Sequence, residues 1–242
     1  MRKLFLFLTA GVLSFLFSQP VHAGPVVAFQ LLDNPSFKNE TIPEVGKYNY
    51  GYEFQVSKPI VINEIGVFDY GLDYFNTQTN TATVSIWNPS DESLVWSKTV
   101  SGADVTQGDV FTSITTGKKG AFYWNDLGTN TVSLAPGTYR ISATYNTVDS
   151  NGDGIQEFAS VATDSGAWAS DITYNDAVYD LSGPPYPERV SNVTSYAYFG
   201  PNFKYSVAPE PQGLALMLMI GVVASGVAFR TKPKTEEQEK EG

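Results

Sequence analysis

The sequence predicts an all-β fold, an antiparallel β-sandwich of jelly-roll type. The chain contains many short segments that are rich in β-branched and aromatic residues, and several of them alternate apolar with polar side chains. Clusters of Gly, Pro, Asn, Asp and Ser separate these segments and favour turns. Between the two hydrophobic ends of the chain, no apolar stripe has helical spacing. Short strands joined by turns are therefore expected throughout this region.

Six segments carry the strand pattern most clearly. They are residues 47–56, 59–68, 81–88, 93–100, 121–126 and 137–146. Val, Ile, Thr, Tyr, Phe and Trp dominate them, and these residues fit a half-buried pleated surface. The turns expected between strands include residues 88–93, 101–109, 116–120 and 135–138. The alternation indicates sheets with one buried face and one wet face.

The first 23 residues have the pattern of a secretory signal peptide. Arg2 and Lys3 precede an apolar run over residues 4–17, and a small-residue cleavage pattern ends at Ala23. The run is short and is followed by a cleavage site instead of a stop-transfer pattern, which argues against an N-terminal anchor. We therefore expect export by the general secretion machinery and a mature chain that begins at Gly24.

The composition restricts the chemistry of the mature chain. Cysteine is absent, and the one histidine, His22, lies in the predicted signal peptide. Ser-His-Asp catalysis, Cys-His catalysis and the usual zinc sites need these residue types, so we expect a non-catalytic protein. Carboxylate pairs, for example Glu53 with Glu64, leave glycoside hydrolysis as an alternative because that reaction needs neither residue type.

Residues 24–207 are long enough for one domain with a sizeable core. Residues 24–208 hold 20 acidic side chains and nine basic ones. Such a negative surface repels nucleic acid and anionic lipid, so no nucleic-acid partner is expected.

A second apolar segment lies near the C-terminus. Residues 213–229 carry no charge, and as a helix they would span about 26 Å, enough to cross the hydrocarbon core of a bilayer. Arg230, Lys232 and Lys234 follow directly, and positive charges beside a spanning helix stay in the cytoplasm. The sequence predicts a transmembrane helix with the domain outside and an acidic tail, residues 235–242, inside.

Pro209, Glu210 and Pro211 precede this segment, where their restricted backbone would hold the chain extended for a membrane-embedded processing enzyme. The order Pro-Glu-Pro, apolar helix and basic cluster over residues 208–234 resembles the PEP-CTERM sorting signal of Gram-negative bacteria. The resemblance implies processing by an exosortase-type enzyme, a transient stay in the inner membrane, and association with exopolysaccharide or biofilm. The chain departs from the family pattern because residues 235–242 follow the basic cluster.

The region before this signal resembles an uncharacterised sandwich domain of such exported proteins. The resemblance rests on "YNYGYEFQVSKPIVINEIGVFDYGLDYF", "VSIWN" and "LAPGTYRISATY", and it implies no activity.

The segment "DSNGDGIQE" has the spacing of a calcium loop. The ligands would be Asp149, Asn151, Asp153, the carbonyl of Ile155, and Glu157. The twelfth position, which takes a bidentate Glu in complete loops, holds Ser160, so a site here would be incomplete and of low affinity. The same residues suit an Asx-rich hairpin turn, and both interpretations stay open.

Aromatic side chains offer platforms on which sugar rings could stack. The four tryptophans are Trp87, Trp96, Trp124 and Trp168. Core and cross-strand roles are the alternative for them, and we expect the tyrosine-rich residues 174–190 to form an exposed loop instead. Three hypotheses result: a structural protein of the surface or matrix, a carbohydrate-binding module-like adhesin, and a carboxylate glycosidase.

Overall fold

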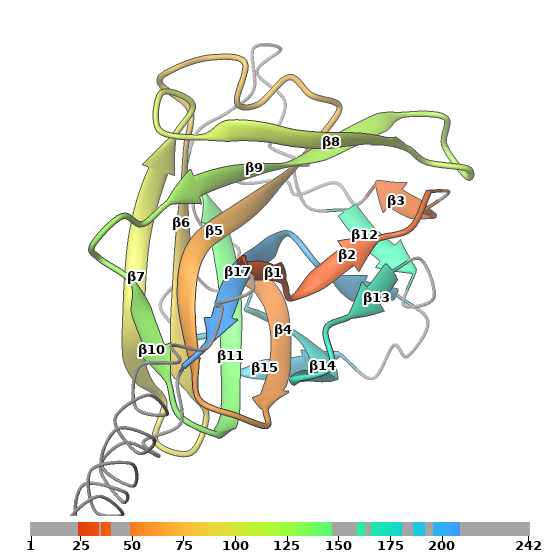
Figure 1. Ribbon diagram of the computed structural model, residues 1–242. Helices are drawn as coiled ribbons and strands as arrows, with labels where there is room; N and C mark the ends of the chain where they lie inside the picture. Colours follow the sequence, from red (N-terminus) through yellow and green to blue (C-terminus); the bar gives the residue numbers. More distant parts are fainter. Residues whose placement is uncertain are drawn as a thin grey trace, which may run out of the picture. The chain divides into compact units, whose positions relative to one another are not determined.

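The computed structural model of the protein describes residues 24–33, 35–39, 49–146, 159–162, 166–180, 186–191 and 196–208. The chain divides into two compact units, Met1–Ala208 and Pro209–Gly242, and all of the described residues belong to the first. These residues form no helix, and their strand pairings are antiparallel (Figure 1). The all-β prediction is therefore confirmed. No helix in this part of the chain is long and apolar enough to cross a membrane.

Two six-stranded antiparallel sheets form most of the domain (Figure 1). We call the first one sheet 1, and its strand order is β1-β17-β5-β9-β8, with β10 also paired to β5. Its strands are β1 (Val26–Val27), β5 (Ile60–Tyr70), β8 (Thr106–Thr112), β9 (Lys119–Asp126), β10 (Val132–Leu134) and β17 (Pro201–Val207).

Sheet 2 has the strand order β15-β14-β4-β11-β6-β7. Its strands are β4 (Asn49–Val56), β6 (Thr81–Asn88), β7 (Ser93–Ser101), β11 (Gly137–Tyr145), β14 (Ile172–Asp180) and β15 (Arg189–Ser191). Two smaller sheets complete the described part. They consist of β3 (Phe37–Asn39), β12 (Ala159–Ala162) and β16 (Tyr196–Tyr198), and of β2 (Phe29–Leu31) with β13 (Gly166–Trp168).

The hydrophobic core lies between sheets 1 and 2. The rings of Phe54 on β4 and Phe203 on β17 are both fully buried, and their centroids lie 5.2 Å apart. Along β6, Ala82, Val84 and Ile86 are buried at every second position, which is the alternation that the sequence shows. Burying an aliphatic or aromatic side chain stabilises a fold by roughly 1.5–3 kcal/mol, so these inner faces hold the two sheets together.

The six segments with the clearest strand pattern are all strands, with bounds within two residues of those expected. Two other stretches correct the prediction. Residues 101–109 were expected as a turn, but β8 begins at Thr106. Residues 174–190 were expected as an exposed loop, but β14 covers the first part of them and Tyr186 is buried.

A β-bulge accompanies each of these two corrections. The register of β8 against β9 shifts between Gln107 and Val110, and that of β14 against β4 shifts between Tyr174 and Asp176. A bulge takes up one or more residues without ending the pairing, so polar and glycine residues that favour turns can stay within a strand.

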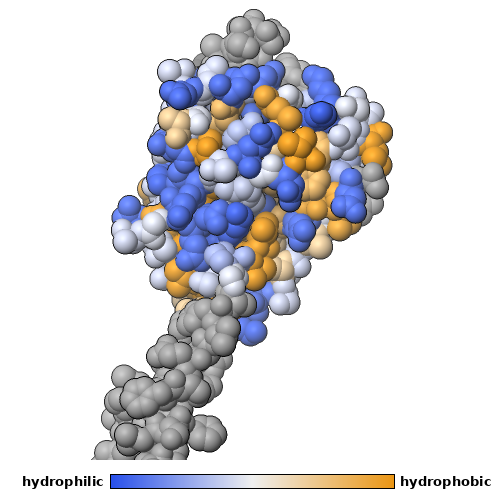
Figure 2. Space-filling view, turned by 45° about the horizontal axis from the view of Figure 1, so that its top comes forward, coloured by the Kyte–Doolittle hydropathy of each residue, from blue (hydrophilic) through white to orange (hydrophobic). Residues whose placement is uncertain are grey.

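The first and last strands of the described part pair with each other. Val26 of β1 lies opposite Tyr205 of β17, and β17 also pairs with β5 (Figure 1). The backbone N–H of Ala208 donates to the carbonyl of Pro59 at 2.8 Å, so the ordered pairing continues to the last described residue. On the face of the domain shown in Figure 2, hydrophobic residues lie in groups separated by hydrophilic ones.

Candidate functional site

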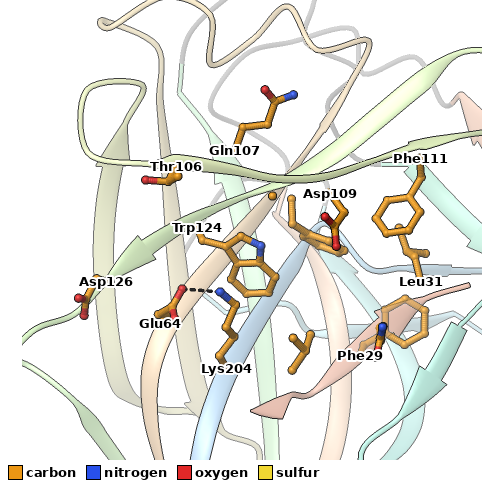
Figure 3. A pocket seen from close by; sticks show the side chains of 14 residues that line it. Phe29, Leu31, Glu64, Thr106, Gln107, Asp109, Phe111, Trp124, Asp126 and Lys204 are labelled. Atoms are coloured by element: carbon orange, nitrogen blue, oxygen red, sulfur yellow. Dashed lines mark hydrogen bonds and ion pairs between the residues drawn. The ribbon is translucent and has the colours of Figure 1, made fainter. Parts of the chain in front are cut away.

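A pocket of about 550 Å³ opens beside sheet 1 (Figure 3). Residues of β5, β8, β9 and β17 form one side of it, and residues of β1 and β2 form the other. The lining consists of Val27, Phe29, Gln30, Leu31, Glu64, Thr106, Gln107, Gly108, Asp109, Phe111, Phe122, Trp124, Asp126 and Lys204. A volume of 300–1,000 Å³ is typical of ligand pockets, and this pocket falls within that range.

The charged side chains of the pocket lie on the outer face of sheet 1, whereas Phe29, Leu31 and Phe122 of its lining also belong to the buried hydrophobic cluster. Glu64 directly precedes the fully buried Ile65, and Lys204 directly follows the fully buried Phe203. Because successive side chains of a strand point to opposite faces, Glu64 and Lys204 point outward. They lie opposite each other in the pairing of β5 with β17.

Two glycines make room for the indole of Trp124. Gly66 lies opposite Trp124 in the pairing of β5 with β9, and a Cβ atom at Gly66 would stand 2.7 Å from Cζ3 of the indole. A Cβ atom at Gly108, within the bulge of β8, would stand 2.7 Å from Nε1. Real Cβ atoms do not approach so closely, so a side chain at either position would displace the ring. The glycines let the indole lie against the sheet.

An ion pair stands beside this indole. The Nζ atom of Lys204 lies 2.7 Å from Oε2 of Glu64 and 4.4 Å from the ring centroid of Trp124. The two charged side chains are 24% and 25% exposed, so water still reaches them. Such a partly exposed ion pair contributes about 1 kcal/mol or less, and a cation–π contact adds a similar amount. Lys204 thus balances the charge of Glu64 and holds both groups at the ring.

Two further carboxylates flank the aromatic centre of the pocket (Figure 3). Asp109 and Asp126 are both exposed, and Asp126 accepts a hydrogen bond of 2.8 Å from the backbone N–H of Gly128. With Glu64 paired to Lys204, these two aspartates give the pocket a negative rim. Phe29, Leu31 and Phe111 form its apolar end (Figure 3). The pocket therefore combines ring surfaces with hydrogen-bond acceptors.

The other tryptophans have packing roles. Trp168 contacts Phe29 and Tyr52, at centroid distances of 4.9 and 5.1 Å. Trp87 is 5% exposed, and Trp96 packs half-buried against the core. Of the four tryptophans, Trp124 is the one that lines the pocket of sheet 1.

Tyr186, which was expected in an exposed loop, is 9% exposed. Its ring packs against Trp87, with the centroids 5.8 Å apart, and the guanidinium of Arg140 lies 5.1 Å from its centroid. Contacts with side chains of sheet 2 that are distant in sequence bury this tyrosine.

The carboxylates of Glu53 and Glu64 belong to different sheets. Glu53 lies on β4 beside the fully buried Phe54, and it accepts a hydrogen bond of 3.0 Å from Nε of Arg140. Its side chain therefore points outward from sheet 2, whereas Glu64 points outward from sheet 1. The core separates the two side chains, so this pair does not share a cleft.

The remaining predicted sites lie outside the described residues, with the exception of Gly24, which is exposed. They are Ala23, the calcium-loop ligands Asp149, Asn151, Asp153, Ile155 and Glu157, the segment Pro209, Glu210 and Pro211, the apolar residues 213–229, and the basic Arg230, Lys232 and Lys234. Within the described part of the chain, no group of three or more acidic or histidine side chains is arranged to hold a metal ion.

No protein-family model matches this sequence, and no curated protein matches it.

Proposed function

We propose that the chain is an exported, non-catalytic protein of the cell surface or extracellular matrix that binds polysaccharide in the pocket of sheet 1. The observation that carries this proposal is the indole of Trp124, which lies over Gly66 among carboxylates. A sugar ring has an apolar C–H face that packs on an aromatic plane, and its hydroxyls donate to carboxylates at the rim. Asp109 and Asp126 are acceptors of this kind, and the ammonium group of Lys204 is a donor for ring and hydroxyl oxygens.

The proposal includes a sandwich of jelly-roll type. Its support is the pair of six-stranded antiparallel sheets with one core between them, and the chain passes repeatedly from one sheet to the other. Jelly rolls include lectin domains, which fits a binding role. Fold alone does not define function, so the pocket carries the argument.

Delivery to the surface is the second part of the proposal. The signal peptide, residues 1–23, would direct export, and an exosortase-type enzyme would process the chain near Pro209–Pro211 while residues 213–229 occupy the inner membrane. The sequence order of residues 208–234 supports this proposal. So does the position of β17, which ends at Val207, because a cut after Ala208 would remove none of the described strands.

The proposal favours binding over glycoside hydrolysis. Hydrolysis needs two carboxyl groups that face each other across the scissile bond. Glu64 is engaged by Lys204, and Glu53 lies on the other sheet. A carboxylate glycosidase remains the alternative, and release of reducing sugar from exopolysaccharide by the purified protein would establish it.

We also propose a structural calcium ion in the loop of Asp149, Asn151 and Asp153, as the spacing of these residues suggests. A cation that binds only the folded loop raises the melting temperature by mass action. The full-length protein should melt at a higher temperature in millimolar calcium than in chelator, and Asp149→Ala with Asp153→Ala should abolish the difference. If the wild-type protein melts at the same temperature in calcium and in chelator, the Asx-rich turn is the correct interpretation.

A glycan array tests the main proposal. The probe is the full-length protein in nanodiscs that hold one chain each, applied to neutral, amino-substituted and acidic polysaccharides. Trp124→Ala should weaken binding by about two- to tenfold, since an aromatic contact is worth about 0.5–1.5 kcal/mol. Ile114→Ala is the matched control, because Ile114 is 66% exposed and lines neither this pocket nor the one described below. Absence of binding, or equal binding by Trp124→Ala, would refute the proposal.

A further inference from the structure

Sheet 2 has a pocket of its own on its outer face, with a volume of about 220 Å³. Hydroxyl and amide side chains from β4, β6, β7 and β11 and from the residue after β11 line it, with Trp87 and Leu94 at one end. Among the described residues that line it, none carries a charge. The described lining is therefore neutral, in contrast to the acidic rim of the pocket on sheet 1.

Strand pairing arranges small hydroxyl side chains in rows across sheet 2. Ser142 of β11 lies opposite Ser85 of β6, which lies opposite Ser97 of β7. In the next row Thr144 lies opposite Thr83, which in turn lies opposite a threonine of β7. Neighbouring strands are about 4.8 Å apart and alternate residues about 6.7 Å, so the hydroxyls form a regular two-dimensional array.

The small side chains in the row of serines leave a hollow beside a much larger neighbour. Trp87 is two residues from Ser85 on the same strand, and its Nε1–H donates to Oγ of Ser142 at 3.3 Å. Tyr186 packs edge-on against the indole, so the ring has a fixed position. Leu94, at the same end of the pocket, is 51% exposed and offers an apolar contact at the rim.

Thr144 carries the strongest evidence that the hollow receives a ligand. This side chain lines the pocket and is 6% exposed, yet its hydroxyl makes no hydrogen bond with any residue in the described part of the chain. The hydroxyl is open to the pocket, because Thr144 Oγ1 is not among the fully buried side-chain atoms that lack a partner, so a ligand there can reach it. Thr83 and Ser85, beside it, are already bonded to Thr99 and Ser97 at 2.8 and 3.0 Å. A ligand hydroxyl would supply the partner that Thr144 lacks.

We propose that this pocket is a second glycan-binding site and that it takes an uncharged segment of polysaccharide. A sugar suits it because each of its hydroxyls both donates and accepts, as the hydroxyls of serine and threonine do. The pocket is smaller than those that enclose a whole drug-sized ligand, so it holds one sugar residue of a longer chain. The inference rests on the proposed function for its ligand class, but it concerns different residues.

The two sites together make the protein bivalent. The core lies between the sheets, with Phe54 and Phe203 in contact across it, so the outer faces of sheets 1 and 2 point in opposite directions. A single polysaccharide chain cannot run straight across both faces, and two chains can each occupy one. The protein would thus cross-link polysaccharide, and tethering through two sites would strengthen attachment without any additional contact.

The test uses the full-length protein in nanodiscs with one chain each and three neutral polysaccharides: dextran, laminarin and galactomannan. Light scattering reports cross-linking, and titration calorimetry reports the number of sites. Thr144→Val removes the hydroxyl and keeps the shape, and Ser97→Trp fills the hollow from an exposed position. Thr173→Val on β14 is the control, since Thr173 is exposed on the same sheet and does not line the pocket.

The expected result is that wild type and Thr173→Val bind at two sites and cross-link at least one of the polysaccharides. Thr144→Val and Ser97→Trp should retain one site and lose the cross-linking, as should Trp124→Ala, which acts on the other face. Cross-linking by both Thr144→Val and Ser97→Trp at the wild-type level would overturn the inference. The absence of any binding would also overturn the inference. Binding that Trp124→Ala alone abolishes would overturn it too, but the function proposed for sheet 1 would then stand. Binding that survives Trp124→Ala unchanged but is lost in Ser97→Trp would refute the proposed function and support this site.

Discussion

At the scale of single residues, glycine decides where the indole of Trp124 lies. Glycine inside a strand costs stability because it has no side chain to pack, so its presence there signals a close approach by another group. A Cβ atom at Gly66 would collide with the six-membered ring of the indole, and a Cβ atom at Gly108 would collide with the indole near its nitrogen. The pocket thus depends on two glycines, one of which, Gly108, is itself part of its lining.

Gly66→Ala should shift the indole and impair the pocket. We expect a loss of about 1–3 kcal/mol in stability, as in other overpacked sites, together with weaker glycan binding. A thermal melt and the glycan titration measure the two effects. Gly137→Ala is the control, because a Cβ atom there would meet its nearest neighbour at an ordinary 3.7 Å. An unchanged melting temperature in Gly66→Ala would show that the ring has room to move.

Sequence patterns identify only part of this site. Trp124 stands out as an aromatic residue within a strand, but Lys204 and Glu64 are separated by 140 positions and meet only through strand pairing. A single sequence contains no signal for that register. The glycines carry a usable signal, since Gly66 stands between the apolar Ile65 and Val67 inside a strand, although the sequence does not reveal which ring lies over it.

At the scale of elements, alternation located six strands of sheets 1 and 2, and local polarity obscured β8 and β14. The segments of β5 and β6 have long apolar alternation that no other structure accommodates as well. In β8, by contrast, Gly108 and Asp109 favour a turn locally. Pairing with β9 overrides that preference, and the two residues are accommodated in a bulge. Tertiary pairing, rather than the local sequence, therefore determines that this segment is a strand.

The last strand of sheet 2, β7, carries a charge that points inward. Lys98 lies opposite the fully buried Val84, and its Nζ donates to Oδ1 of Asn125 on β9 at 2.7 Å. An inward-pointing charge is one device by which edge strands avoid pairing with another copy of the chain.

Lys98→Val should therefore promote self-association through β7. Size-exclusion chromatography with light scattering should show dimers or larger species at concentrations where wild type is monomeric. Lys119→Val removes the same charge from an exposed position on β9 and should leave the elution unchanged. If both variants elute as wild type, the inward lysine does not protect this edge.

The turns beside β7 make the fold sensitive to acid. Hydrogen bonds from the hydroxyl and the backbone N–H of Ser101 lower the pKa of Asp104 below its usual 3.8, and Ser93 lowers the pKa of Asp91 in the same way. A carboxyl whose pKa is lower in the folded than in the unfolded chain stabilises the fold above its usual pKa. That contribution disappears as the pH falls below 3.8 through the folded value.

Asp104→Asn should accordingly lower the melting temperature at pH 7 and have little effect at pH 2.5, where wild type has lost the same contribution. Melting curves over this range measure the difference, with Asp33→Asn as a substitution of an exposed aspartate elsewhere. A constant difference between Asp104→Asn and wild type at all pH values would contradict the assignment.

At the scale of the whole molecule, the sequence pattern at the two ends predicts a route of delivery. Replacing Pro209, Glu210 and Pro211 by alanine should retain the protein in the inner membrane of its host, because the processing enzyme would lose its recognition segment. Fractionation followed by mass spectrometry checks this outcome. Surface material that consists only of chains ending at Gly242 would favour a plain membrane anchor instead.

The pairing of β1 with β17 has a consequence for the timing of folding. If the chain is exported from its N-terminal signal peptide onward, β1 crosses the membrane early and its partner strand β17 crosses last among the described strands. Sheet 1 cannot be completed until Val207 has crossed, since β17 lies between β1 and β5. Pairing between strands so far apart in sequence forms slowly, so the exported domain stays unfolded while it passes through a narrow channel. The strand that completes the sheet ends next to the predicted sorting segment, so the domain would finish folding only when that segment reaches the membrane.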